Sequence, residues 1–238
     1  MKRFFMYTLA MLLIALQGTA MASEVLKVNT SIKPPFSTKA QTGFIDLLIK
    51  ELGRRMGWEM ELVRQPPERA LLSANAGFSD IELPRIGGLQ KTYPNLIQIE
   101  EKVIDYHFVA FSRFKKPLPS WDGLIGERVG YLIGWKIFES NVSDSAAITK
   151  LRRPDQLFEM LDQGRIDVAL YERYAGWARI RSQGYDSIKE CEPPLATRPM
   201  YMYIHASRKN LADAITHHLR AMKADGTYQQ LSARTLNR

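Results

Sequence analysis

Cysteine and histidine often supply the nucleophile and the base of an active site, and this chain has few of them. It contains one cysteine, Cys191, and four histidines, none of them near Cys191 in the sequence. A catalytic thiol needs a base to activate it, so we expect Cys191 to be structural or incidental. The Gly-x-Ser-x-Gly, His-Glu-x-x-His and Cys-x-x-Cys motifs are absent from the sequence. We therefore expect no enzymatic activity, no metal and no cofactor.

One turn has the residue types of an anion site. Residues 128–133 are typical of a buried strand, and Gly134 and Trp135 follow it where a helix could begin. Exposed backbone N–H groups at a helix start bind carboxylates. Gly134 is therefore a candidate ligand contact, and Trp135 either lines the ligand site or packs inside the protein.

The elements that must position such residues alternate between strand and helix patterns. Residues 43–56 form the clearest amphipathic helix, and Lys33-Pro34-Pro35-Phe36 before it predicts an extended loop. Strands are predicted at 26–30, 59–63, 80–83, 97–103 and 106–111, with a helix at 67–76. From Trp121 the pattern restarts, with strands at 128–133, 166–171 and 200–204 and helices at 154–161, 172–181, 211–222 and 226–231.

This alternation predicts an α/β fold with open, mostly parallel sheets and helices on both faces. Because the pattern restarts, we expect two lobes, each an open sheet flanked by helices. The strands at 106–111 and 200–204 are the natural crossings between the lobes. Ligands of open α/β sheets bind at the carboxyl ends of strands, so the cleft between the lobes is the expected binding site.

The first 22 residues predict a secretory signal peptide. Lys2 and Arg3 precede an apolar run from Tyr7 to Leu16, and Ala20-Met21-Ala22 is a small-x-small cleavage site. The run is shorter than the roughly 20 residues of a membrane span. We expect the chain from Ser23 onward to act outside the cytoplasm, in the periplasm.

The charge of the chain is basic but scattered. The net charge is +8 at pH 7, and removal of the signal peptide leaves about +6, because 31 of the 33 Lys and Arg then remain beside 25 Asp and Glu. The basic residues occur as short pairs, which favours a solvated surface over a nucleic-acid patch. We expect a monomer that binds no nucleic acid.

Three segments resemble a known family when taken together. They are Lys33-Pro34-Pro35-Phe36 with Gly43-Phe44-Ile45-Asp46-Leu47-Leu48, then residues 75–80, then residues 162–172. In order and spacing they look like the periplasmic solute-binding proteins of polar amino-acid transporters, family 3, with the type II periplasmic binding fold. The resemblance implies a first lobe of residues 23–110 with 200–238 returning to it, and a second lobe of residues 111–199. Closure of the two lobes on a small polar solute is the expected motion.

The resemblance also implies two charged contacts for an amino-acid ligand. In the family an arginine after the third strand binds the ligand carboxylate; Arg85 has the suitable fork, whereas the family spacing falls nearer Lys91. Either residue is otherwise a surface cation. An acid at the end of a second-lobe strand accepts from the ligand ammonium, and Glu172 holds that position where the family more often has Asp. Glu172 would otherwise be a first-turn helix residue favoured by the helix dipole.

Aromatic residues complete the predicted site. Phe36 lies where the family places a ring against the ligand, and core packing is its alternative role. Tyr106 is a weaker candidate, as is Tyr171. The implied partners are a small polar solute, an amino acid above all, and a membrane transporter permease.

Two further functions remain open on the same scaffold. Some secreted dehydratases of aromatic amino-acid synthesis resemble this family, and Glu172 could then donate a proton in a closed cleft. A ligand-sensing module for a membrane partner is the third hypothesis, because fold does not fix function. Recovery of a permease, without a sensor, in a co-purification would exclude the sensing function.

Overall fold

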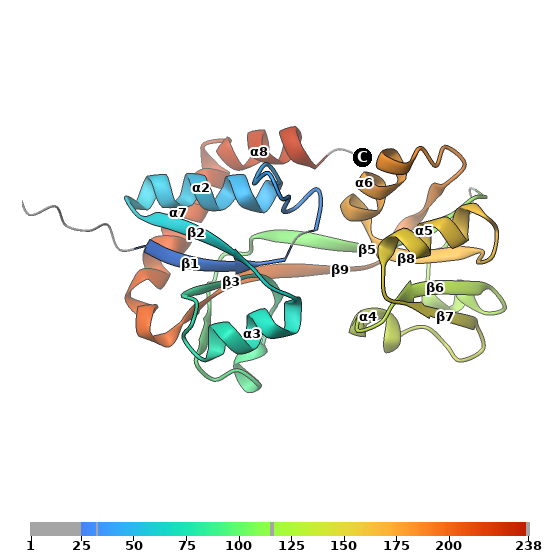
Figure 1. The fold of residues 1–238 in the computed structure, drawn as a ribbon, viewed down its shortest axis with the longest axis horizontal. Helices are drawn as coiled ribbons and strands as arrows, with labels where there is room; N and C mark the ends of the chain where they lie inside the picture. Colours follow the sequence, from blue (N-terminus) through green and yellow to red (C-terminus); the bar gives the residue numbers. More distant parts are fainter. Residues whose placement is uncertain (1–24, 32, 115–116, 237–238) are drawn as a thin grey trace, which may run out of the picture.

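The computed structural model describes residues 25–31, 33–114 and 117–236. The strands form one hydrogen-bonded path in the order β2-β1-β3-β9-β5-β8-β6-β7, with β4 paired to β9. Figure 1 shows that the path runs through two lobes, each with helices packed on its sheet. The predicted signal peptide at residues 1–22 lies outside the described residues.

The first lobe contains both ends of the described chain. Its strands β1 and β2 are parallel, as are β1 and β3, and α7 and α8 pack against α2. This lobe comprises β1 (Val25–Thr30), α2 (Phe44–Met56), β2 (Glu59–Arg64), α3 (Pro67–Asn75), β3 (Ile81–Ile86), η1 (Leu89–Lys91), β4 (Leu96–Gln98), η3 (Ala206–Leu211), α7 (Ala212–Ala224) and α8 (Thr227–Thr235).

The second lobe is a smaller sheet with its own helices. Strand β6 is parallel to both β7 and β8, and α5 and α6 pack against this sheet. The lobe comprises η2 (Trp121–Leu124), β6 (Arg128–Leu132), α4 (Lys136–Glu139), β7 (Ala147–Leu151), α5 (Pro154–Asp162), β8 (Val168–Glu172) and α6 (Arg173–Gln183).

Two long antiparallel strands join the lobes. β5 (Ile104–Ser112) pairs with β9 (Lys189–His205) over most of its length, and β9 also pairs with β3 while β5 pairs with β8. In Figure 1 both strands pass from one lobe to the other. A change in the angle between the lobes must therefore bend β5 and β9 or the loops beside them.

The structure confirms most predicted elements and corrects several. The predicted crossing strand at 200–204 is the end of the 17-residue β9, and the strand predicted at 97–103 is the three-residue β4. Strand β7 was not predicted. The expectation of mostly parallel sheets is correct for the outer strands and wrong where the lobes meet, because β5 and β9 run antiparallel to their neighbours. Cys191 is buried in the core on β9.

Helix α6 packs so closely on β5 that one position accepts only glycine. A Cβ atom on Gly176 would lie 2.3 Å from Cε2 of Phe111, a fully buried ring that also contacts Phe158. We expect Gly176→Ala to lower the free energy of unfolding by about 1–3 kcal/mol, the usual range for an overpacked core. Urea denaturation measures it, and Gln183→Ala, at an exposed position of α6, should change the value by less than about 0.5 kcal/mol. Equal stability of Gly176→Ala and the unmodified protein would contradict this packing.

No helix among the described residues combines the length and the apolar character needed to cross a lipid bilayer.

Candidate functional site

The ammonium group of Lys33 lies among four aromatic rings. Its Nζ atom is 4.5 Å from the ring centre of Tyr106 and 4.6 Å from that of Trp135. The ring centres of Phe36 and Tyr171 are 5.5 and 5.8 Å away. All four distances are within the roughly 6 Å over which a cation is attracted to an aromatic face. We call these four rings the aromatic cage.

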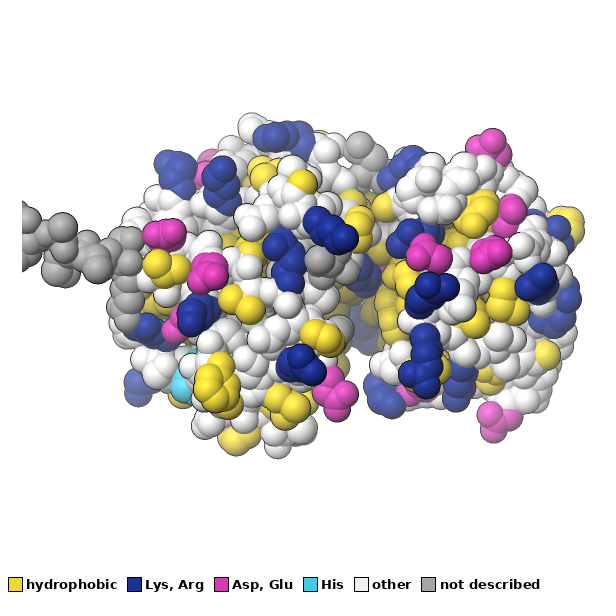
Figure 2. All heavy atoms as spheres, viewed as in Figure 1, with side chains coloured by type: hydrophobic (Ala, Val, Ile, Leu, Met, Phe, Trp, Pro, Cys, Tyr) yellow, Lys and Arg dark blue, Asp and Glu magenta, His cyan; other side chains and the backbone are white. Residues whose placement is uncertain are grey.

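The cage combines both lobes. Lys33 and Phe36 belong to the loop after β1, and Tyr106 lies on the joining strand β5, whereas Trp135 precedes α4 and Tyr171 lies on β8. The cage therefore lies where the lobes meet, and Figure 2 shows the molecular surface hollowed between them. This position agrees with the expected cleft.

The rings support one another as well as Lys33. Phe36 packs on Tyr106 with ring centres 4.8 Å apart, and Trp135 stacks on Tyr171 at the same spacing. Phe36 also meets Tyr174 of α6 edge to face. Such pairs stabilise a fixed arrangement by about 0.5–1.5 kcal/mol beyond the area they bury. The tilted pair Phe36–Tyr106 and the stacked pair Trp135–Tyr171 both lie within reach of the Lys33 ammonium.

The loop that carries Lys33 and Phe36 is fastened to the start of α2. The N–H groups of Phe44 and Ile45 donate to the carbonyl oxygens of Pro35 and Phe36, at 3.0 and 2.7 Å. A Cβ atom on Gly43 would lie 2.5 Å from the carbonyl oxygen of Phe36, so the loop approaches α2 more closely than any other residue would allow. The Pro34-Pro35-Phe36 segment and Gly43 thus fix the position of the backbone from which the Lys33 side chain extends.

Glu172 is the second charged group at the cleft. It is the last residue of β8 and the N-cap of α6, and its Oε2 accepts from the N–H of Ala175 at 2.9 Å. The residue is fully buried, and its Oε1 has no hydrogen-bond partner within the part of the chain that the structure describes. The position of Glu172 is therefore compatible with both predicted roles. Oε2 caps the start of α6, and Oε1 remains available to a ligand.

Glu172 and Lys33 perturb each other. Burial raises the pKa of Glu172 to about 7, and the Lys33 ammonium opposes this rise. Burial lowers the pKa of Lys33 to about 8, and the negative charge of Glu172 opposes that fall. Burial raises the pKa of Tyr106 above its usual range, and the negative charge of Glu172 raises it further. The carboxylate thus lies close enough to act on both groups.

Arg85 is held by a buried carboxylate. Its Nε and Nη2 atoms approach Oε1 of Glu82 at 2.6 and 2.5 Å, and Glu82 is only 1% exposed. Burial raises the pKa of Glu82 to about 7, and Arg85 opposes this rise. The positive charge of Arg85 also acts on Tyr106, where it partly opposes the rise in pKa that burial causes. The Nε edge of the Arg85 guanidinium is therefore engaged by the protein.

The structure separates the remaining predicted contacts. Lys91 is exposed on η1, and Gly134 is exposed with its N–H donating to Oε1 of Glu139 at 2.9 Å. Phe36, Tyr106, Trp135 and Glu172 are brought together. Sequence reasoning did not select Lys33, although it lies in the Lys-Pro-Pro-Phe segment from which Phe36 was chosen. The signal that could have identified Lys33 is its place in this segment, close to the aromatic residue predicted to contact the ligand.

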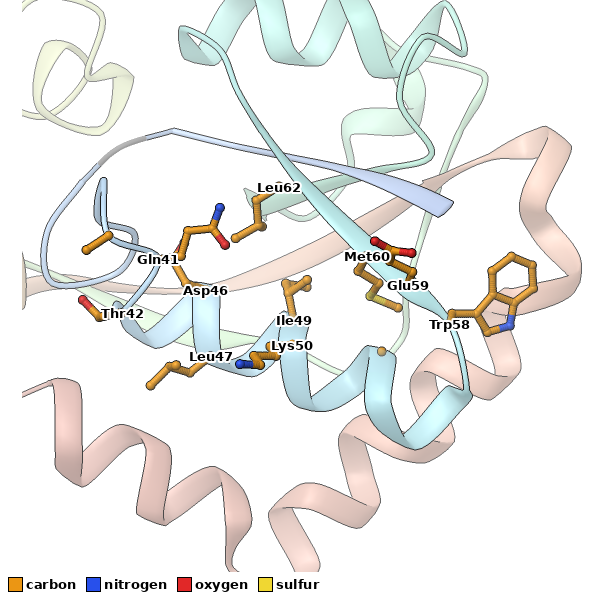
Figure 3. Close-up of a pocket in the computed structure, with 12 residues that line it drawn as sticks. Gln41, Thr42, Asp46, Leu47, Ile49, Lys50, Trp58, Glu59, Met60 and Leu62 are labelled. Carbon is orange, nitrogen blue, oxygen red and sulfur yellow. The ribbon is translucent and has the colours of Figure 1, made fainter. Parts of the chain in front are cut away.

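A second hollow lies between α2 and β2 of the first lobe, and no cage residue lines it. Its lining includes Asp46, Leu47 and Ile49 of α2 and Met60 and Leu62 of β2, which Figure 3 labels. The Asp46 carboxylate already accepts from Ser37, Thr38 and Gly43. None of the predicted ligand contacts lines this hollow, so it is not the expected site.

Comparison with known proteins identifies the fold. No family model and no curated protein sequence matches the chain. Among solved structures, an ancestral arginine-binding protein bound to glutamine is 19% identical with a TM-score of 0.73, over 90% of this chain and 98% of that one. The substrate-binding protein of an amino-acid ABC transporter is 17% identical with a TM-score of 0.71, over 90% and 100%. The ancestral amino-acid-binding protein AncCDT-1, a precursor of cyclohexadienyl dehydratase, is 18% identical with a TM-score of 0.71, over 90% and 95%. The predicted two-lobed periplasmic binding fold is confirmed.

Proposed function

We propose that this protein is a solute-binding protein that captures an amino acid, or a similar small polar solute, between its lobes for a membrane ABC transporter. The observation that carries the proposal is the meeting of the aromatic cage with Glu172 at the boundary of the two lobes. Ligand sites are typically apolar surfaces with a few polar groups that fix orientation. The likeness of the fold to amino-acid-binding proteins supports the same class of ligand.

The proposal extends to the parts of the chain and to its place in the cell. The first lobe is residues 23–110 with 200–238, the second is residues 111–199, and the protein is a periplasmic monomer that performs no chemistry. The run of β5 and β9 through both lobes supports this division. Arg85, Lys91, Glu172, Phe36, Tyr106, Trp135 and Gly134 are the ligand contacts predicted from the sequence, and the grouping of four of them favours those four.

A thermal-shift screen of amino acids, polyamines and small carboxylates tests the proposed function. A ligand at about 100 times its Kd stabilises the fold by roughly 2.7 kcal/mol, which raises the Tm of a protein of this size by about 5–10 °C. We expect such a shift from an amino acid, and a shift at least halved in Glu172→Gln at the same ligand concentration. A shift from none of these solutes would contradict the proposal.

A dehydratase is the second candidate function, and the state of Glu172 favours it. A carboxyl group with a pKa of about 7 in a buried site donates a proton efficiently near neutral pH. The fold is also similar to that of a protein described as a precursor of cyclohexadienyl dehydratase. Incubation with prephenate or arogenate decides between the functions, since the absence of any product would exclude the dehydratase.

A further inference from the structure

Each of two opposite charges at the cleft has a polar atom without a hydrogen-bond partner among the described residues. No described residue forms a hydrogen bond or an ion pair with Nζ of Lys33, which lies against the four ring faces of the aromatic cage. Oε1 of Glu172 is likewise without a partner. Buried or half-buried charges are costly unless something pairs with them. A solute that carries both an anionic group and a cationic donor would supply what each charge lacks.

The two charges act on each other without forming an ion pair among the described residues. Each appears among the groups that shift the pKa of the other, yet no ion pair within 4.0 Å joins them among the described residues. Lys33 comes from the first lobe and Glu172 from the second. A zwitterion placed between them would bridge the lobes and so stabilise the closed arrangement.

Arg85 and Lys91 are less well placed for the anionic group. The Nε edge of Arg85 already meets the buried carboxylate of Glu82, and removing Arg85 from that carboxylate would leave an unpaired buried charge. Lys91 is exposed on η1. Lys33, by contrast, is only partly exposed, and its ammonium is oriented by rings from both lobes.

We propose that Lys33 binds the carboxylate of the solute, while Glu172 keeps the role that the family resemblance already implies for it, accepting hydrogen bonds from the solute's ammonium group. This assignment rests on the proposed solute-binding function and names the class of ligand, a small zwitterion of the α-amino acid type. The aromatic cage holds the Lys33 ammonium by attraction to the ring faces and leaves its N–H groups without an acceptor in the described residues. Charge-assisted hydrogen bonds to the carboxylate then replace water.

The pairing also determines what the cleft rejects. An amine without a carboxylate would place a second positive charge beside Lys33, and a carboxylate without an ammonium would leave Oε1 of Glu172 unpaired. A site built to pair with a polar group discriminates strongly against analogues that lack that group, because its own buried atoms are then left unsatisfied.

Isothermal titration calorimetry with matched probes tests the assignment. The probes are L-glutamine, L-arginine and L-alanine; their decarboxylated analogues 4-aminobutanamide, agmatine and ethylamine; and their deaminated analogues 4-carbamoylbutanoate, 5-guanidinopentanoate and propanoate. We expect the unmodified protein to bind an amino acid at least about tenfold more tightly than its decarboxylated analogue, a difference of about 1.4 kcal/mol. Lys33→Met should abolish that preference. Lys39→Met, at an exposed lysine of the same loop, should retain it.

Each result separates the assignment from the proposed function. Equal or tighter binding of the amino acid by Lys33→Met, or loss of the preference in Arg85→Met alone, would overturn the role of Lys33 and leave the solute-binding function standing. Binding of only the amines would do the same. Binding of only the deaminated carboxylates, lost in Lys33→Met, would support Lys33 and contradict an amino-acid ligand. Binding of none of these probes would overturn both.

Discussion

The free energy of unfolding of this protein should fall by about 4 kcal/mol between pH 5 and pH 7.5, the opposite of the usual trend for a protein rich in carboxylates. Burial raises the pKa of Glu172 and of Glu82 from 4.5 to about 7. Between these two values the folded protein binds more protons than the unfolded chain. Stability therefore decreases as the pH rises through this range, by about 2 kcal/mol for each carboxyl group.

The other shifted groups act outside this range. Arginine side chains and helix-terminal N–H groups lower the pKa of Glu51 and Asp225 to about 2, so their stabilising contribution is present above the unfolded pKa and is lost as the pH falls below it. Burial lowers the pKa of Lys33 to about 8, so the unfolded chain binds more protons between pH 8 and 10.5 and stability rises there. Tyr106 and Tyr171 have raised pKa values and do not titrate near neutral pH. Stability should be greatest near pH 5.

Urea denaturation at pH 5, 6, 7 and 8 measures this profile. Glu172→Gln and Glu82→Gln should each remove about half of the decrease, because each removes one of the two protonations that folding favours. Glu68→Gln, at an exposed position of α3, should leave the profile unchanged. A free energy of unfolding that stays constant or rises from pH 5 to 7.5 would show that these carboxyl groups titrate as they do in water.

The sequence predicted the elements of the site better than the site itself. The period of α2 and the alternation of β1 and β2 follow directly from local sequence, because one face of each is buried against the same core. Strand β7 was missed: Ala147-Ile148-Thr149-Lys150-Leu151 is short and only half-buried, so its alternation is weak. The full length of β9 was missed because it includes three prolines, Pro193, Pro194 and Pro199, which usually argue against a strand.

The charged residues show why contacts are harder to predict than elements. Glu172 was identified from its position at the end of a strand, which topology fixes. Arg85 was selected for its chemistry, yet it pairs with Glu82, three positions away on the same strand. The burial of Glu82 is a property of the folded sheet and is not visible in the local sequence. The place of Lys33 depends on Trp135 and Tyr171, more than 100 residues away in sequence, so no local pattern could reveal it.

Asp46→Ala should be among the most damaging single substitutions in the first lobe, because it removes the group that fastens the ligand loop. Asp46 is 2% exposed, and its carboxylate accepts from Oγ of Ser37 at 2.6 Å and from the N–H groups of Thr38 and Gly43 at 2.9 and 3.0 Å. Each donor left unsatisfied costs about 1–3 kcal/mol. We expect a loss of about 3–5 kcal/mol in the free energy of unfolding.

The same substitution should also loosen the loop that carries Lys33 and Phe36, and with it the aromatic cage. The loop between Lys33 and Thr38 is held to α2 by the hydrogen bonds from Phe44 and Ile45 and by Asp46, so loss of the carboxylate should expose those two amides to exchange. Hydrogen exchange at the amides of Phe44 and Ile45, measured by NMR, should then be faster than in the unmodified protein. Ligand affinity should also fall. Asp155→Ala, which removes a surface ion pair to Arg179, should cost at most about 1 kcal/mol and leave these amides protected. If Asp46→Ala lost stability with unchanged exchange at Phe44 and Ile45, the carboxylate would stabilise α2 alone, and the position of Lys33 would depend on the rings around it.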